Sequence, residues 1–121
     1  MLKVENLSVS YGAINALRGI SFDVKEGEII SLIGSNGAGK TTTLHAISNI
    51  IKKQSGKVIF AGQDVTNVSA DIIVKRNLIQ VPEGRRIFLN MSVKENLEMG
   101  AYTRTDKANI KNDLAKVYEL F

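Results

Sequence analysis

The fold is decided by the stretch Gly34-Ser35-Asn36-Gly37-Ala38-Gly39-Lys40-Thr41. It fills every fixed position of the pattern G-x-x-x-x-G-K-[ST], the phosphate-binding P-loop. The apolar run 28–33 before it predicts a short buried strand, and residues 42–51 after it predict a helix. The apolar face of that helix is expected to contain Leu44, Ile47 and Ile51. A strand, a glycine-rich loop and a helix start in this order direct backbone N–H groups at one point, which favours an anion site over a glycine-rich turn that binds nothing.

Each position of the loop has a chemical reason. Glycines at three places let the backbone approach phosphate oxygens with no Cβ in the way. Lys40 offers an ammonium group to the β- and γ-phosphates, Thr41 offers a hydroxyl to Mg²⁺, and Thr42 can donate to a phosphate oxygen. The motif therefore predicts ATP with Mg²⁺ as the cofactors. The expected phosphate-binding residues are Gly34, Ser35, Asn36, Gly37, Ala38, Gly39, Lys40, Thr41 and Thr42.

Length and composition exclude several classes of protein. The chain has 121 residues, the size of one ordinary domain, and it contains no cysteine, so no disulfide or thiolate metal site is expected. No run of eighteen apolar residues occurs, and the N-terminus carries no signal-peptide core. The net charge of +4 is spread without an aromatic-interleaved basic stripe, so nucleic acid is not an expected partner.

Hydrophobic periodicity predicts the remaining elements. Strands are expected at residues 2–9, 17–24, 57–60, 63–65 and 78–81, with a hairpin turn at Ala61-Gly62. Helices are expected at residues 69–76, at 93–99 with Ser92 and Glu95 as a capping box, and from Thr105 or Asp106 to Phe121. Because the last helix reaches Phe121 with an intact apolar face and no C-cap, we expect the chain to be cut from a longer one.

Four further stretches accompany the P-loop: Tyr11-Gly12, residues 56–66 (GKVIFAGQDVT), residues 81–88 (VPEGRRIF) and residues 91–97 (MSVKENL). Together they resemble the nucleotide-binding subunit of an ABC transporter. The stretch at 81–88 is similar to one of the two ATP-binding subunits of bacterial branched-chain amino acid importers. The resemblance extends over the whole chain, which corresponds to about the first half of such a subunit.

The resemblance implies an α/β fold, a P-loop NTPase of the ABC ATPase type with an N-terminal antiparallel β part, truncated before the second half of the core sheet. Residues 1–121 would be the N-terminal part of one nucleotide-binding domain, with the P-loop at 34–41 and a Q-loop-like segment at about 80–91. Tyr11 would stack on adenine; alternatively it caps a strand end. Glu83 would approach Mg²⁺ where most of the family has glutamine; alternatively it is a surface turn residue.

The same resemblance implies partners. Residues 85–98 would face transmembrane permease subunits, through the arginine pair Arg85-Arg86 and the exposed apolar side chains of Ile87, Phe88, Leu89 and Met91. Alternatively the arginines belong to a solvated face and Phe88 to the core. A second ATP-binding subunit would complete a head-to-tail dimer around two ATP molecules, on the cytoplasmic face of the cell membrane.

Several parts that the family needs for hydrolysis do not occur between Met1 and Phe121. There is no apolar strand ending in Asp-Glu, no Ser-Gly-Gly loop and no histidine following such a strand. We therefore expect no catalytic residue in this chain and no ATP turnover. Because the run 28–33 is left uncovered, we expect the chain to associate with itself, to borrow a strand or to adopt a partly altered packing. The leading hypothesis is an ATPase subunit of an importer; the alternative is a nucleotide-binding or docking fragment. An unrelated nucleoside kinase fits less well, because β-rich residues precede the P-loop.

Overall fold

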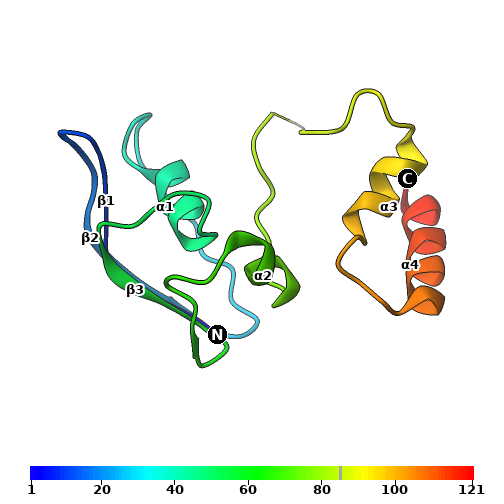
Figure 1. Ribbon diagram of the computed structural model, residues 1–121, viewed down its shortest axis with the longest axis horizontal. Helices are drawn as coiled ribbons and strands as arrows, with labels where there is room; N and C mark the ends of the chain where they lie inside the picture. The colour runs from blue at the N-terminus through cyan, green and yellow to red at the C-terminus, as the bar shows by residue number, and fades with distance from the viewer. Residues whose placement is uncertain (85) are drawn as a thin grey trace. The chain divides into compact units, whose positions relative to one another are not determined.

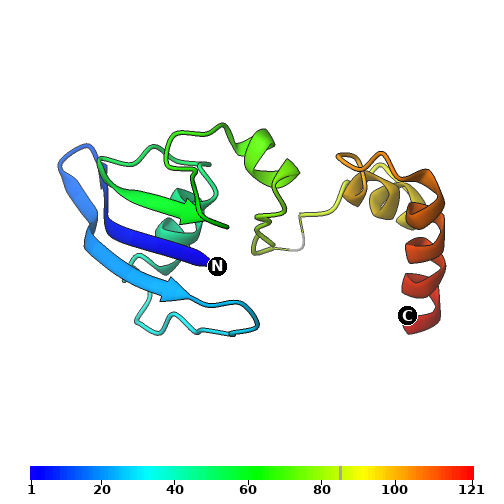
Figure 2. The ribbon, with the colours of Figure 1, turned by 90° about the horizontal axis from the view of Figure 1, so that it is seen from below.

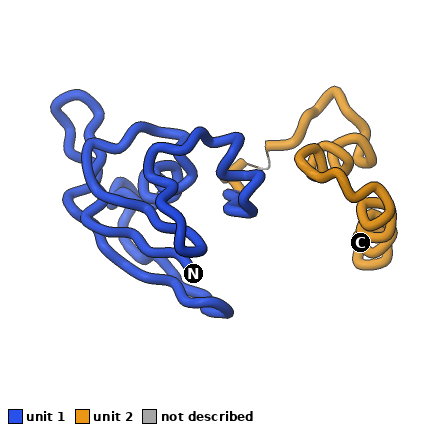
Figure 3. The backbone as a smooth tube through the Cα atoms, turned by 60° about the horizontal axis from the view of Figure 1, so that its bottom comes forward, with its two compact units in different colours: residues 1–80 blue, residues 81–121 orange. Residues whose placement is uncertain are grey.

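The computed structural model describes residues 1–84 and 86–121, which form two compact units: residues 1–80 and residues 81–121 (Figure 3). The first unit contains strands β1 (Leu2–Tyr11), β2 (Ile14–Val24), β3 (Ser55–Phe60) and β4 (Gln63–Asp64), with helices α1 (Lys40–Ile47) and α2 (Ala70–Lys75). The second unit contains helices α3 (Val93–Gly100) and α4 (Lys107–Leu120). Among the described helices, none is both long and apolar enough to cross a membrane.

The strands form one antiparallel sheet in the order β2-β1-β3-β4, with β1 between its two long neighbours (Figures 1 and 2). The strands predicted from alternation at 2–9, 17–24 and 57–60 are confirmed, and β2 begins earlier, at Ile14. The hairpin predicted at Ala61-Gly62 is also confirmed. Both turn residues have positive φ, 48° and 77°, as a type I′ turn requires.

A bulge at Asn6 bends the central strand. Asn6 has a φ of 47°, and the pairing register shifts on both sides of β1 at this point. The backbone N–H of Asn6 donates instead to the Ser21 hydroxyl at 2.8 Å, and the N–H of Gly19 donates to the Ser8 hydroxyl at 2.9 Å. Gly56 lies so close to the bulge that a Cβ would stand 2.6 Å from the Asn6 carbonyl oxygen. Side-chain hydroxyls thus replace ladder bonds that the bulge removes.

Helix α1 covers one face of this sheet (Figure 2). Its buried residues are Thr43, Ala46 and Ile47, which join the apolar side chains of the strands in one core. The other fully or largely buried members are Val4, Leu7, Val9, Leu17, Val58, Phe60, Val65 and Ile73. The predicted face was wrong at Leu44, which is 44% exposed, because the helix presents the Thr43 side of its surface to the sheet.

The end of α1 is fixed by its own turn. Asn49 takes a φ of 54°, and the N–H of Ile50 donates to the His45 carbonyl at 2.9 Å, which ends the helix at Ile47 rather than at the predicted Ile51. The Asn49 side chain donates to the carbonyls of Val65 and Val68, and so ties this end of α1 to the segment before α2.

Two predicted strands do not form. Residues 28–33, before the P-loop, and residues 78–81 are not strands in this structure. The prediction that 28–33 is buried was also wrong, because Ile29 is 96% exposed and Ile33 is 94% exposed. A β-strand needs a neighbour for its backbone hydrogen bonds. All pairings among the described residues are antiparallel pairings of β1 to β4, and they include neither segment.

The second unit contains two helices, of which α3 has a side-chain cap at its start. The capping box predicted at the start of α3 is confirmed: the Ser92 hydroxyl accepts from the Glu95 N–H at 3.3 Å, and the Glu95 carboxylate accepts from the Ser92 N–H at 2.7 Å. Asp106 occupies the N-cap position of α4 as predicted, but its side chain does not cap the helix. Its carboxylate instead accepts two hydrogen bonds from the Arg104 guanidinium, at 3.0 and 2.6 Å.

Candidate nucleotide site

The P-loop lies between the extended segment 28–33 and α1, and glycine conformation shapes it. Gly37 and Gly39 have φ values of 86° and 87°, in the left-handed region that side chains disfavour. The N–H of Ala38 donates to the Ser35 carbonyl at 3.1 Å, which closes the loop on itself. Gly39 is the N-cap of α1, so the turn leads directly into the helix.

Gly39 also fixes the loop against the sheet. A Cβ at this position would lie 2.6 Å from Leu17 Cδ2 and 2.9 Å from the backbone oxygen of Ala16. The side chain of Leu17 is buried in the core, and the Ala16 oxygen belongs to β2, so neither atom can move away easily. Gly34 is less constrained, because a Cβ added there would contact only the Ala38 methyl group, at 2.9 Å. Of the two, Gly39 is the position that ties the loop to the fold.

The Lys40 ammonium folds back over the loop. Its Nζ donates to the carbonyl oxygens of Gly34 and Ser35, both at 2.7 Å. A lysine ammonium has three donors, so this arrangement holds the charge above the loop with donor capacity left for an anion. The positive end of α1 adds to the same field, and the first turn of α1 contains no acidic residue that would oppose it.

The threonines that follow have different environments. Thr41 is exposed and Thr42 is half-buried, whereas Thr43 is buried and its hydroxyl donates to the Gly39 carbonyl at 2.8 Å. Mg²⁺ in nucleotide sites is held by one or two protein oxygens together with phosphate oxygens and waters. An exposed hydroxyl one residue after Lys40 fits that need. Among the described residues, no group of three His, Cys, Asp or Glu side chains gathers that could hold a metal without a nucleotide.

Tyr11 is the last residue of β1, two positions after the buried Val9 and four after the buried Leu7, and this spacing predicts that it shares their face of the sheet. It pairs with Ile14, three residues before the Leu17 side chain that lies against Gly39. Tyr11 is 50% exposed, so its side chain is not part of the core.

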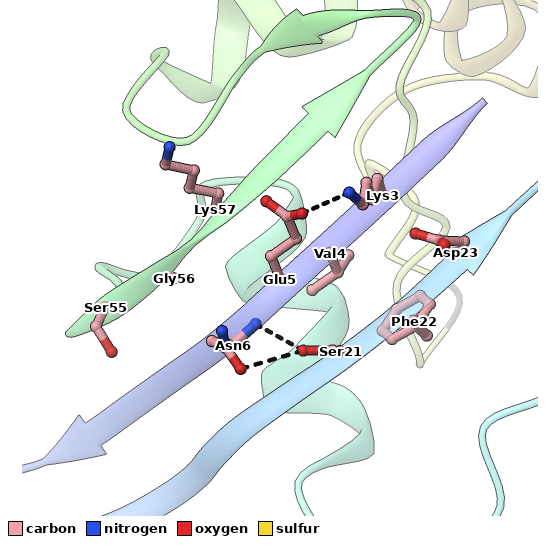
Figure 4. Close-up of a pocket in the computed structure, with 10 residues that line it drawn as sticks. All are labelled: Lys3, Val4, Glu5, Asn6, Ser21, Phe22, Asp23, Ser55, Gly56 and Lys57. Carbon is pink, nitrogen blue, oxygen red and sulfur yellow. Dashed lines mark hydrogen bonds and ion pairs between the residues drawn. The ribbon is translucent and has the colours of Figure 1, made fainter.

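A hollow of about 780 Å³ lies on the opposite face of the sheet (Figure 4). Lys3 and Glu5 form an ion pair of 2.5 Å there, Asp23 lies opposite Lys3 on β2, and Lys57 lies opposite Glu5 on β3. The pair lowers the pKa of Glu5 and raises that of Lys3. Two cations and two anions balance here, so this hollow lacks the positive field that a triphosphate needs.

Glu83 and the expected docking residues belong to the second unit. Glu83 is exposed, and its backbone carbonyl accepts from the Arg86 side chain at 3.2 Å. Thr41 lies in the first unit, whereas Glu83 lies in the second. Arg85, part of the predicted arginine pair, lies outside the described residues. Phe88 is 55% exposed, which disagrees with the alternative that placed it in the core.

A shallow apolar hollow of about 450 Å³ occurs beside these residues. Its lining includes Arg86, Ile87, Phe88, Leu89, Met91 and Val93. The sequence indicated the apolar side chains but not the residue that organises them, Asn96, whose side-chain amide bonds the backbone of this segment. An asparagine near a helix start carries no sequence signal for such a contact, because its partners are backbone atoms four to eight residues earlier in the chain.

Comparison with known proteins agrees with this architecture. The family described as ABC transporter matches residues 17–120. The chain belongs to this family. The resemblance to ABC transporter ATP-binding subunits that the sequence indicated is therefore confirmed.

The names of relatives in the ABC transporter family state different transported substrates. A high-affinity branched-chain amino acid transport ATP-binding protein, BraG of Pseudomonas aeruginosa, is 40% identical over 121 residues, which are 100% of this chain and 52% of that protein. A molybdate/tungstate import ATP-binding protein of Pyrococcus horikoshii is 38% identical over 104 residues, 86% of this chain and 29% of the relative. The chain thus spans about half the length, or less, of these relatives.

Solved structures of the family confirm the fold class. A dimeric bacterial ABC transporter cassette superposes with a TM-score of 0.79 at 24% identity, over 95% of this chain and 55% of the cassette. An ATP-binding subunit of an ABC transporter superposes with a TM-score of 0.72 at 28% identity, over 88% of this chain and 45% of that subunit. The fold is that of part of an ABC ATPase cassette, with its antiparallel β part and P-loop helix in place.

Proposed function

We propose that this chain is part of an ATP-binding subunit that powers an ABC importer for branched-chain amino acids. The proposal that the chain binds a nucleotide is supported by one observation. The Lys40 ammonium lies over the glycine-rich loop, and Gly39 packs that loop closely against β2. A preorganised cation at a helix N-terminus favours phosphate groups. The cargo follows from the name of the relative that is 40% identical over the whole chain.

In this proposal each residue of the site has a role. The loop backbone from Gly34 to Gly39 surrounds the phosphates, and Lys40 exchanges its two carbonyl contacts for β- and γ-phosphate oxygens. Thr41 supplies one oxygen to Mg²⁺, Thr42 donates to a phosphate, and Tyr11 stacks on adenine. Glu83, which lies in the second unit, offers a carboxylate oxygen of the kind that Mg²⁺ prefers. When bound, Mg²⁺ neutralises charge on the phosphate oxygens.

The same comparison supports a proposal for the partners. Transmembrane permease subunits would dock on the apolar segment of the second unit, and a second ATP-binding subunit would complete a head-to-tail dimer. A dimeric cassette is among the solved relatives, and a structure of it bound to ADP and Pi superposes with a TM-score of 0.76 over 95% of this chain at 24% identity. The subunit would then lie on the cytoplasmic face of the cell membrane, held there by the permease.

The direct test is Mg-ATP binding measured by titration calorimetry on the chain and on Lys40→Ala. Losing a charge-assisted contact worth about 1.5–3 kcal/mol should weaken binding by roughly 10- to 150-fold. The matched control is Lys111→Ala, which removes an exposed lysine of α4 and should leave binding unchanged. Equal affinity of the chain and Lys40→Ala for Mg-ATP would refute the assignment.

A second candidate is nucleotide binding without turnover by the chain as given. Two observations favour it: the segment before the P-loop is exposed, and residues 1–121 contain no Asp-Glu strand or Ser-Gly-Gly loop. Phosphoryl transfer depends on positioning and charge stabilisation, so these parts carry most of the rate enhancement. Phosphate release from Mg-ATP should therefore equal that of a protein-free control, and a rate clearly above it would exclude this candidate.

A further inference from the structure

The side chain of Asn96 makes four hydrogen bonds to the backbone of one short segment. Its Oδ1 accepts from the Phe88 N–H at 2.8 Å, and its Nδ2 donates to the Phe88 carbonyl at 3.1 Å. The same Nδ2 also lies 3.2 Å from the Met91 carbonyl and 3.0 Å from the Ser92 carbonyl, so its two N–H groups are shared among three carbonyl oxygens. One amide group therefore pairs with both polar groups of Phe88 and closes the turn that leads from Phe88 into α3.

Apolar packing does not hold this segment in place. Ile87 is 61% exposed, Phe88 is 55% exposed and Leu89 is 87% exposed, so three consecutive large side chains point into solvent. Burial of large apolar side chains usually stabilises a loop, and here it would favour an arrangement in which these three side chains are covered. Hydrogen bonds to Asn96 oppose that collapse and keep the apolar side chains available.

Helix α3 provides a firm base for these bonds. Asn96 follows the Glu95 of the capping box, and the N–H of Asn96 itself donates to the Ser92 carbonyl at 3.0 Å. Hydrogen bonds from the Ser92 backbone and hydroxyl lower the pKa of Glu95, which keeps its carboxylate charged and the box closed. The capping box and the helical hydrogen bond of Asn96 therefore hold the backbone from which the Asn96 side chain extends.

We propose that Asn96 is a positioning residue that presents segment 87–91 to the membrane-spanning partner. This inference rests on the proposed function, because the partner is the permease that the proposal gives to this subunit. The occupant is the apolar face of a permease segment: among the described residues, the hollow beside Asn96 is lined by apolar side chains and by the cation Arg86, and so complements an apolar surface with an acidic group at its edge.

The first experiment tests the positioning step without any partner. Asn96→Leu has a similar size, removes all four side-chain bonds and raises helix propensity, so α3 is retained. In this variant the amide of Phe88 should exchange its hydrogen about tenfold faster or more than in the original chain. Asn112→Leu makes the same change at an exposed position of α4 and should leave that amide unaffected. An unchanged Phe88 exchange rate in Asn96→Leu overturns the inference.

A second variant separates positioning from a general loss of structure. In Asn96→Asp at neutral pH, the carboxylate has no donor for the carbonyls of Phe88, Met91 and Ser92, but it still accepts from the Phe88 N–H. Protection of the Phe88 amide should therefore be retained in Asn96→Asp and lost in Asn96→Leu. Equal loss of protection in the two variants overturns the inference.

The second experiment tests docking. Since the chain has no cysteine, Leu89→Cys can carry a single environment-sensitive fluorophore. The probe is a proteoliposome that contains the permease subunits of the Pseudomonas aeruginosa transporter to which BraG belongs. Adding Asn96→Leu should weaken binding about tenfold, while Asn112→Leu should not. Binding equal with and without Asn96→Leu overturns the inference, whereas no binding by the labelled chain with Asn96 intact refutes the docking function itself.

Discussion

At the scale of single residues, Tyr11 is the position at which a role of the sheet in nucleotide binding can be tested. It follows Leu7 and Val9 at the spacing of one strand face, and its side chain is half exposed. A base stacked on an aromatic ring gains about 1–3 kcal/mol. A ring that only capped the end of β1 would contribute to stability and not to affinity.

Tyr11→Ala should therefore weaken Mg-ATP binding by roughly 5- to 150-fold and leave pyrophosphate binding unchanged, since pyrophosphate has no base to stack. Competition titrations with both ligands measure this difference. Tyr102→Ala, at an exposed position of the second unit, serves as the control and should change neither affinity. Equal losses for the two ligands in Tyr11→Ala would show that the tyrosine acts on the fold instead.

Gly39 has two roles: it packs the P-loop against β2, and it begins the helix that follows the loop. Its positive φ starts α1, and its missing side chain lets the loop touch the Ala16 oxygen and the Leu17 side chain of β2. The motif pattern names this glycine for its approach to phosphate. The structure adds a second reason, the contact with β2, which no local pattern could reveal because the partner lies more than twenty residues earlier in the chain.

At the scale of elements, predictions that depend on neighbouring residues in the sequence were correct, whereas predictions that depend on a distant strand partner were wrong. The strands β1 to β3, the Ala61-Gly62 hairpin and the α3 capping box follow from alternation, turn chemistry and cap residues within a few positions. Residues 28–33 and 78–81 carry equally apolar patterns but form no strand. Their pattern gives a preference for burial, whereas strand formation depends on a neighbour that composition cannot supply.

The link before α4 makes a pH-dependent contribution to stability. Hydrogen bonds from Arg104 lower the pKa of Asp106 to about 2, and those to Asp113 lower its pKa as well. Both carboxylates lie within 2.8 Å of Arg104. Because a free aspartate titrates near about 3.9, a group with a lower pKa in the folded state stabilises the fold above that pH. The contribution is lost as the pH falls toward about 2.

Unfolding in urea, followed by helix ellipticity between neutral and strongly acidic pH, should show this loss. In Arg104→Leu the carboxylates lose their partner, so stability should depend less on pH in the acid range. The effect should be small, since exposed ion pairs contribute little. Lys111→Leu removes a cation that does not pair with Asp106 and should keep the original pH dependence. An identical acid-range slope in Arg104→Leu would exclude the pairing as its cause.

At the scale of the whole molecule, the chain combines a formed phosphate loop with an uncovered apolar segment directly before it. Ile29 and Ile33 are almost fully exposed, and their backbone has no partner strand among the described pairings. Exposed apolar residues with unpaired N–H and C=O groups favour addition of another strand. A second copy of the chain offers the same segment, so two copies can cover each other there.

We therefore expect the chain to self-associate in a way that depends on residues 28–33. Sedimentation across a dilution series should show a reversible change in mass, and Ile29→Lys should shift it toward the monomer, because a charge at this position opposes burial. Val93→Lys, at an exposed position of α3, is the matched control and should leave the association unchanged. A monomer at every concentration would mean that 28–33 stays uncovered. Equal effects of the two lysines would mean that the copies meet through another surface.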